Sequence, residues 1–178
     1  MASTSARDVL RPLRLPGYAF LGVTIVLQAA DFVLTIAPLR PLALMWRFAT
    51  LGSASGNVGN ILLLILLLYV FALLLQDRPA LLIVSISTAI LSLSLILAGA
   101  AFSLDAMQLR SRIDAQVVQR FDIASAEAIV KFIAQGIVSA LLSLSALRSW
   151  RLLTREFHRD ERPSEEMVVV RGAPSRTA

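Results

Sequence analysis

The sequence has no cysteine and a single histidine, His158. Without cysteine, disulfides, thiolate catalysis, quinone-linked thiol chemistry and cysteine-ligated zinc are all excluded. One histidine cannot build a histidine-based metal cluster or a pair of haem ligands. We therefore predict no metal site, no cofactor and no catalytic residue.

Charge is also scarce, because Asp, Glu, Lys and Arg make up only 16% of the residues, against about 25% in ordinary soluble domains. The chain is 57% hydrophobic and its mean hydropathy is +0.74. A net charge of +5 and a pI near 10.9 could suggest nucleic acid, but the arginines stand beside apolar runs. Retention of positive charge on the cytoplasmic side explains such arginines, so we predict a membrane protein and no nucleic-acid partner.

Long apolar runs are what the chain does have. Two of them, between Ile61 and Phe102, are separated only by Gln76, Asp77, Arg78 and Pro79. About 20 helical residues cross a hydrocarbon core of roughly 30 Å, and proline stops a helix from continuing. The sequence predicts an all-α, polytopic bundle of four transmembrane helices, with spans at about 17–36, 58–76, 80–102 and 126–147.

The first span is expected to remain uncleaved. The apolar region of a signal peptide has about 7–15 residues and leads into a small-residue cleavage site. Here the run is longer, and Pro38 directly follows Ala37.

The connections between the spans have their own patterns. Trp46 beside Arg47 indicates either a short helix at the level of the lipid headgroups or a plain loop. Residues 52–60 are rich in Gly, Ser and Asn, which is typical of a loop. Residues 103–121 place apolar side chains four apart, which predicts a short amphipathic helix in the external connection between spans 3 and 4, at Leu109, Ile113, Val117 and Phe121. That helix could rest on the membrane, extend the third span or cover the loop around Trp46.

Small residues recur every seven positions on the third span, at Ser85, Ser92 and Gly99, with Ser87 and Ser94 beside them. The fourth span has a similar face of Gly136, Ala140 and Ser143. Such faces let helix backbones approach closely. We favour a packing seam over a polar pore lining, because isolated hydroxyls usually bond back to their own helix.

Arginine sets the predicted orientation. Eleven arginines outside the spans fall on the side of both termini and five on the other side, so both termini should be cytoplasmic, in a bacterial plasma (inner) membrane. Residues 148–159 form a basic juxtamembrane helix that we expect to lie along anionic lipid at the cytoplasmic face, through Arg148, Arg151, Arg155 and Trp150, with Trp46 contacting lipid at the other surface. Residues 160–178 lack any period and are expected to be a disordered cytoplasmic tail.

Two charges fall inside the predicted spans, Asp31 on the first and Lys131 on the fourth. Each lies five residues from the external end of its span, with Gln28 and Gln135 one turn deeper. Matched depths predict an intramembrane pair that packs the first span on the fourth. It could be a structural clasp, a pair of side chains that reach the boundary separately, or a titrating step in transport.

No motif indicates an enzyme or a nucleotide site. The acids of the external connections are interleaved with arginine, which argues against a divalent-ion site. We expect an accessory, scaffold or interaction subunit that contacts the lipid bilayer and a membrane-protein partner or further copies of itself. The alternative is a small oligomeric transporter or channel that uses Asp31, with Lys131, as its titrating site.

Overall fold

The computed structural model describes residues 11–160, in which a 3₁₀ turn, η1 (Arg11–Leu13), leads into four α-helices. These are α2 (Arg14–Thr35), α3 (Leu44–Leu74), α4 (Arg78–Arg110) and α5 (Ala115–Asp160). All four are long and apolar enough to cross a membrane, and residues 11–160 contain no strand. The predicted all-helical architecture, with four helices long and apolar enough to span a membrane, is thus confirmed. The tail predicted at 160–178 lies outside the described residues, apart from Asp160.

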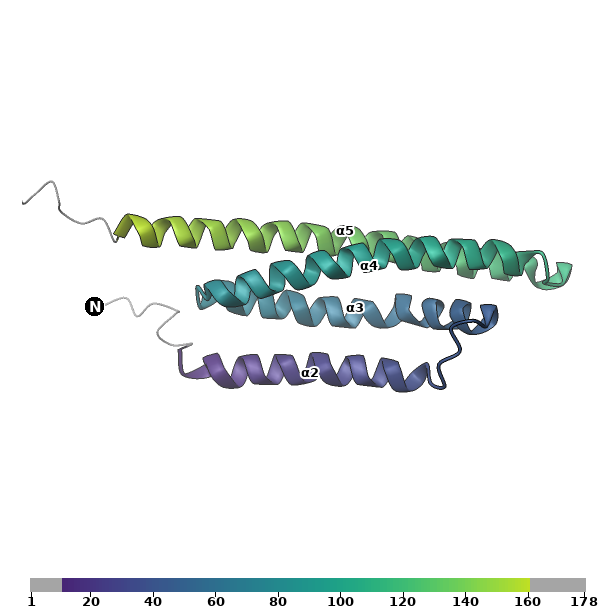
Figure 1. The fold of residues 1–178 in the computed structure, drawn as a ribbon, viewed down its shortest axis with the longest axis horizontal. Helices are drawn as coiled ribbons and strands as arrows, with labels where there is room; N and C mark the ends of the chain where they lie inside the picture. Colours follow the sequence, from purple (N-terminus) through teal and green to yellow (C-terminus); the bar gives the residue numbers. More distant parts are fainter. Residues whose placement is uncertain (1–10, 161–178) are drawn as a thin grey trace, which may run out of the picture.

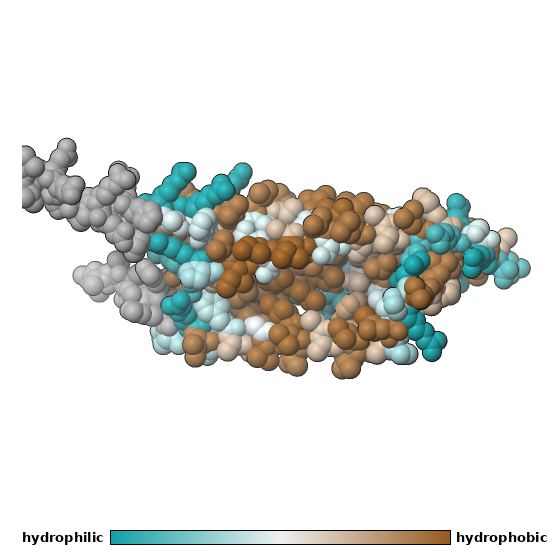
Figure 2. Space-filling view, viewed as in Figure 1, coloured by the Kyte–Doolittle hydropathy of each residue, from teal (hydrophilic) through white to brown (hydrophobic). Residues whose placement is uncertain are grey.

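The helices alternate in direction, so the start of α2 and the end of α5 lie at the same end of the molecule (Figure 1). An apolar surface covers the middle of the visible face, and polar side chains gather at its two ends (Figure 2). We call the end with Arg14, Arg78 and Arg148 the basic end and the opposite end the distal end. This distribution matches a bilayer, whose hydrocarbon core faces apolar side chains and whose headgroups face charge.

The hydrophobic core lies among α3, α4 and α5. One buried cluster joins Ile65, Val84, Leu142 and Ala146, and a second joins Leu95, Phe102, Ala128 and Phe132. Aromatic stacking extends the second cluster, since the ring of Phe48 stacks on that of Phe102 with centroids 4.7 Å apart. By contrast, α2 has no buried residue and packs mainly against α3. The molecule is therefore a three-helix core with α2 added at its edge (Figure 1).

The packing seam predicted on the third span is present between α4 and α5. Ser85 Oγ donates to Ser143 O at 3.0 Å, Ser143 Oγ donates to Ser85 O at 2.8 Å, and Ser92 Oγ donates to Gly136 O at 2.9 Å. Gly99 faces Phe132, where a Cβ would lie 3.1 Å from Phe132 Cβ. Ser87 and Ser94 are exposed and take no part in the seam. Small side chains let α4 and α5 approach closely along much of their length.

The loop predicted at residues 52–60 is wrong, because α3 runs through it without a break. Its polar side chains bond to carbonyls of their own helix, as when Ser55 Oγ donates to Gly52 O and Asn57 Nδ2 donates to Ser53 O. In hydrocarbon a backbone without internal hydrogen bonds is very costly, so a segment that would be a loop in water stays helical.

The short amphipathic helix predicted at 103–121 is also wrong. Its first part continues α4 to Arg110, a turn follows, and α5 begins at Ala115. The chain reverses at hydrogen bonds from Arg112 N to Leu109 O and from Val117 N to Asp114 O. The four-residue spacing arose because the apolar faces of two antiparallel helices follow one another across the turn. The resulting α4–α5 hairpin extends beyond α2 and α3 at the distal end (Figure 1).

Candidate functional site

The structure does not bring the four predicted intramembrane polar residues together. Lys131 forms an ion pair with Glu127 one turn away on α5, and Gln135 Nε2 donates to Ser55 O of α3 at 2.8 Å. Asp31 and Gln28 lie on α2, which packs mainly against α3. The predicted Asp31–Lys131 contact is therefore wrong, and the partner of α5 along the seam is α4.

Two physical reasons explain this error. The predicted depth of Lys131 assumes that the last span begins at Ala126. In the structure α5 begins at Ala115, about 16 Å earlier at the rise of an α-helix. In addition, equal depth says nothing about which helices are neighbours. Here α3 packs against all three of the other long helices and occupies the position that the prediction gave to α5.

Asp31 is nevertheless unusual, because it is an exposed acid on a membrane-crossing helix. Within residues 11–160 its carboxylate has no hydrogen bond or ion pair, and only its backbone oxygen accepts a bond, from Thr35 Oγ1 at 2.9 Å. The surrounding surface of α2 is apolar, with Leu34 at 74% and Leu27 at 63% exposed. An ionisable side chain at such a place is a default functional candidate.

Three Arg–Asp pairs that the sequence did not reveal join α2 to the α3–α4 turn, α3 to α4, and α4 to α5. Arg14 Nη2 lies 2.8 Å from Asp77 Oδ2, which precedes α4. Arg47 of α3 binds Asp105 of α4, with Nη2 to Oδ1 at 2.7 Å and Nε to Oδ2 at 3.2 Å. Arg110 of α4 lies 2.8 Å from Asp122 of α5.

These pairs differ in burial, and burial decides how much they contribute. Asp77 and Asp105 are 8% and 5% exposed, whereas Asp122 is half-exposed. A buried carboxylate needs its cation, while an exposed ion pair contributes little. One sequence signal could have identified Asp105, which lies three residues after Phe102 and four before Leu109, on the face of α4 that is buried.

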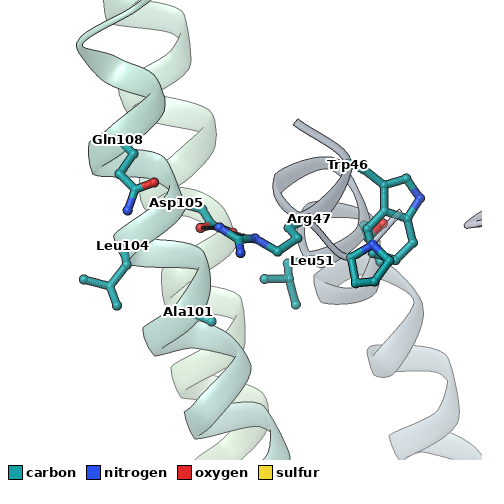
Figure 3. Close-up of a pocket in the computed structure, with 9 residues that line it drawn as sticks. Trp46, Arg47, Leu51, Ala101, Leu104, Asp105 and Gln108 are labelled. Carbon is teal, nitrogen blue, oxygen red and sulfur yellow. Dashed lines mark hydrogen bonds and ion pairs between the residues drawn. The ribbon is translucent and has the colours of Figure 1, made fainter. Parts of the chain in front are cut away.

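A cleft of about 440 Å³ opens beside the Arg47–Asp105 pair, between α3 and α4 at the distal end. Figure 3 shows Arg47 reaching from α3 to Asp105 on α4, with Leu51 next to Arg47, and with Gln108 above and Leu104 below Asp105 on α4. Trp46 also lines the cleft, on the side of Arg47 away from α4, and its Nε1 donates to Ile36 O at 3.0 Å. The Trp46 ring is half-buried, and its predicted contact with lipid stays a prediction.

At the basic end, α5 continues as one helix past the ends of α3 and α4 (Figure 1). Arg148, Arg151 and Arg155 are exposed, and Trp150 is half-buried. The helix does not turn aside, so this extension continues along the axis of α5. Its contact with anionic lipid stays a prediction.

Among residues 12–155, whose side chains the structure describes, no group of three or more Asp or Glu side chains is placed to hold a metal ion. The chain matches no family model, and no curated protein or solved structure was found to be similar to it.

Proposed function

We infer that this chain is an accessory or scaffold subunit of a membrane complex, and that the outer face of α2 is the surface that receives a partner. The observation that carries this proposal is Asp31, an exposed acid with no partner among the described side chains, on a helix that buries none of its residues. The other three helices pack on one another through the seam and the core, although they too expose apolar side chains. What distinguishes α2 is that it combines an exposed acid with the absence of any buried residue.

The chemistry of this face specifies the partner. A charged side chain in the middle of a membrane costs about 2.5–3.5 kcal/mol on insertion scales, although a position near the boundary lowers that cost. A transmembrane helix with a lysine, arginine or amide at the depth of Asp31 would relieve the cost. We therefore propose a different membrane protein with such a residue as the occupant of this face.

The setting we propose is the bacterial inner membrane, with the basic end in the cytoplasm and the distal end outside. Arg14, Arg78, Arg148, Arg151 and Arg155 gather at the basic end, as retention of positive charge requires. Anionic lipid at that face would contact the first turns of the α5 extension. No enzymatic activity is proposed.

Purification in a mild detergent tests the proposal. We expect the wild-type chain to retain another membrane protein in a fixed ratio and Asp31→Asn to lose it, while Asp114→Asn, in the exposed α4–α5 turn, keeps it. Identical recovery with Asp31→Asn would contradict the assignment of the α2 face.

Recovery of a pure homo-oligomer would contradict the accessory function. It would favour the transporter alternative, in which Asp31 titrates. In that case Asp31→Asn should abolish ion-coupled uptake while insertion into the membrane is unchanged.

A further inference from the structure

The cleft beside Arg47 combines an apolar floor with a polar rim. Leu51, Ala101 and Leu104 form the floor, and Arg47, Thr50 and Gln108 stand at the rim. Its volume of about 440 Å³ lies within the range of roughly 300–1,000 Å³ that ligand sites occupy. Leu104 is 62% exposed, so the floor opens onto the outer surface of the bundle. An amphiphile, with a polar group above a hydrocarbon chain, fits this arrangement.

The rim offers hydrogen-bond donors to an anion. Arg47 uses Nε and Nη2 on Asp105, which leaves its Nη1 group available, and its side chain is 41% exposed. The Thr50 hydroxyl and the Gln108 amide add further donors. Since Asp105 already balances the charge of Arg47, the rim suits a group with a single negative charge better than one with several. A phosphodiester has one negative charge and several acceptor oxygens.

The position of the cleft along the helices agrees with this chemistry. Trp46 and Arg47 lie in the first turn of α3, directly after the connection from α2. Tryptophan and arginine are typical of the level at which hydrocarbon meets headgroups. A phosphate at the rim would therefore lie at headgroup height, and a chain on the floor would point toward the bilayer centre.

We propose that this cleft is a binding site for one phospholipid of the distal leaflet. Its phosphodiester is held by Arg47, Thr50 and Gln108, and one acyl chain runs along Leu51, Ala101 and Leu104 between α3 and α4. The site is separate from the outer face of α2, so it does not depend on the function proposed above.

Tryptophan quenching tests the site in the full chain. The sequence has two tryptophans, so Trp150→Phe leaves Trp46, which lines the cleft, as the only emitter. The protein is held in nonionic maltoside micelles and titrated with brominated phosphatidylglycerol or with brominated diacylglycerol that has the same chains but no phosphate. We expect the phospholipid to reach half-maximal quenching at a roughly tenfold lower mole fraction, which corresponds to about one charge-assisted hydrogen bond.

A variant tests which residues contact the phosphate group. A competitor tests whether the bound phosphate belongs to a phospholipid or is a free anion. In the same background, the double change Thr50→Val and Gln108→Leu removes two donors and keeps the Arg47–Asp105 pair, and it should erase most of the difference between the two lipids. Gln119→Leu, an exposed amide outside the cleft, should preserve that difference. Inorganic phosphate in large excess should not relieve the quenching, because it lacks a chain for the floor.

Three results would overturn the proposal: equal quenching by the two lipids, a double variant that behaves like the control, or displacement of the phospholipid by inorganic phosphate. The last would show a site for a free anion.

Discussion

At the scale of single residues, the serine hydroxyls inside the bundle differ in whether they find an acceptor. Ser85 and Ser92 of α4 donate to carbonyls of α5 across the seam. Ser139 of α5 is fully buried, and its hydroxyl has no hydrogen-bond partner within residues 11–160. A buried polar group without a partner lowers stability, whereas one that is paired across helices adds to it.

Substitution of these serines should separate the two cases. Ser92→Ala is expected to lower the free energy of unfolding by about 0.5–1.5 kcal/mol, because the bond to Gly136 O is lost. Ser139→Ala is expected to leave it unchanged or to raise it. Reversible unfolding in mixed micelles, followed by helical circular dichroism, measures both. Equal losses from both variants would mean that Ser139 has a partner, such as an internal water.

The charged residues show which properties could be predicted from the sequence at this scale and which could not. Composition and arginine placement were enough to indicate a membrane protein and to locate its basic end. The partners of the charges could not be predicted, because pairing depends on which helices are neighbours. Asp105 and Arg47 are 58 residues apart and Asp77 and Arg14 are 63 apart, and no local pattern links either pair.

At the scale of helices, α2 is attached to the core through few contacts. Tyr18 packs edge-on against Phe71 with ring centroids 5.1 Å apart, and Arg14 pairs with Asp77 near the same level. Gly17 makes this approach possible, because a Cβ at that position would lie 2.5 Å from Phe71 Cζ. Gly22, on the same helix, has nothing within 4 Å of its added Cβ.

A larger side chain at Gly17 should therefore detach the start of α2. Gly17→Leu is expected to cost about 1–3 kcal/mol through the clash with Phe71, while Gly22→Leu, facing open space, should cost little. The measurement is the free energy of unfolding in mixed micelles, followed by helical circular dichroism. Equal losses from both leucine variants would contradict a close contact at Gly17.

The helices also show which boundaries the sequence could predict. Pro79 and the polar residues before it placed the α3–α4 turn correctly, since a proline near the start of a helix is a local signal. The loop prediction for residues 52–60 was wrong, because turn propensities describe chains in water. The bilayer instead favours continuous backbone hydrogen bonding. The α4–α5 turn was missed because Ser111 and Asp114 are weak breakers within a periodic stretch. Helix type was thus predictable, whereas the start of α3, the end of α4 and the start of α5 were not.

At the scale of the whole molecule, the alternating helices place the two ends of the described chain on one side. The α4–α5 turn and the start of α3 lie on the other side (Figure 1). The 46 residues of α5 extend about 69 Å, more than twice the hydrocarbon thickness of roughly 30 Å. Parts of α5 must therefore project into water on at least one side.

The absence of cysteine allows these sides to be assigned with single-cysteine variants. Ser111→Cys, in the exposed α4–α5 turn, should react with a membrane-impermeant maleimide added to intact cells. Arg151→Cys, exposed at the basic end, should react only after permeabilisation, if positive charge is retained in the cytoplasm. The opposite labelling pattern would reverse the proposed orientation.

The loose attachment of α2 has a consequence for biosynthesis. During translation α2 is made before α3, α4 and α5, yet the core of the finished protein depends on it little. The contribution of α2 would then be to the orientation of α3, α4 and α5 rather than to their packing. By crossing the bilayer first, α2 places the start of α3 on the opposite side from the start of the chain's first helix. Loss of this helix would leave a core able to pack, in which only the remaining arginines at the basic end set the direction of insertion.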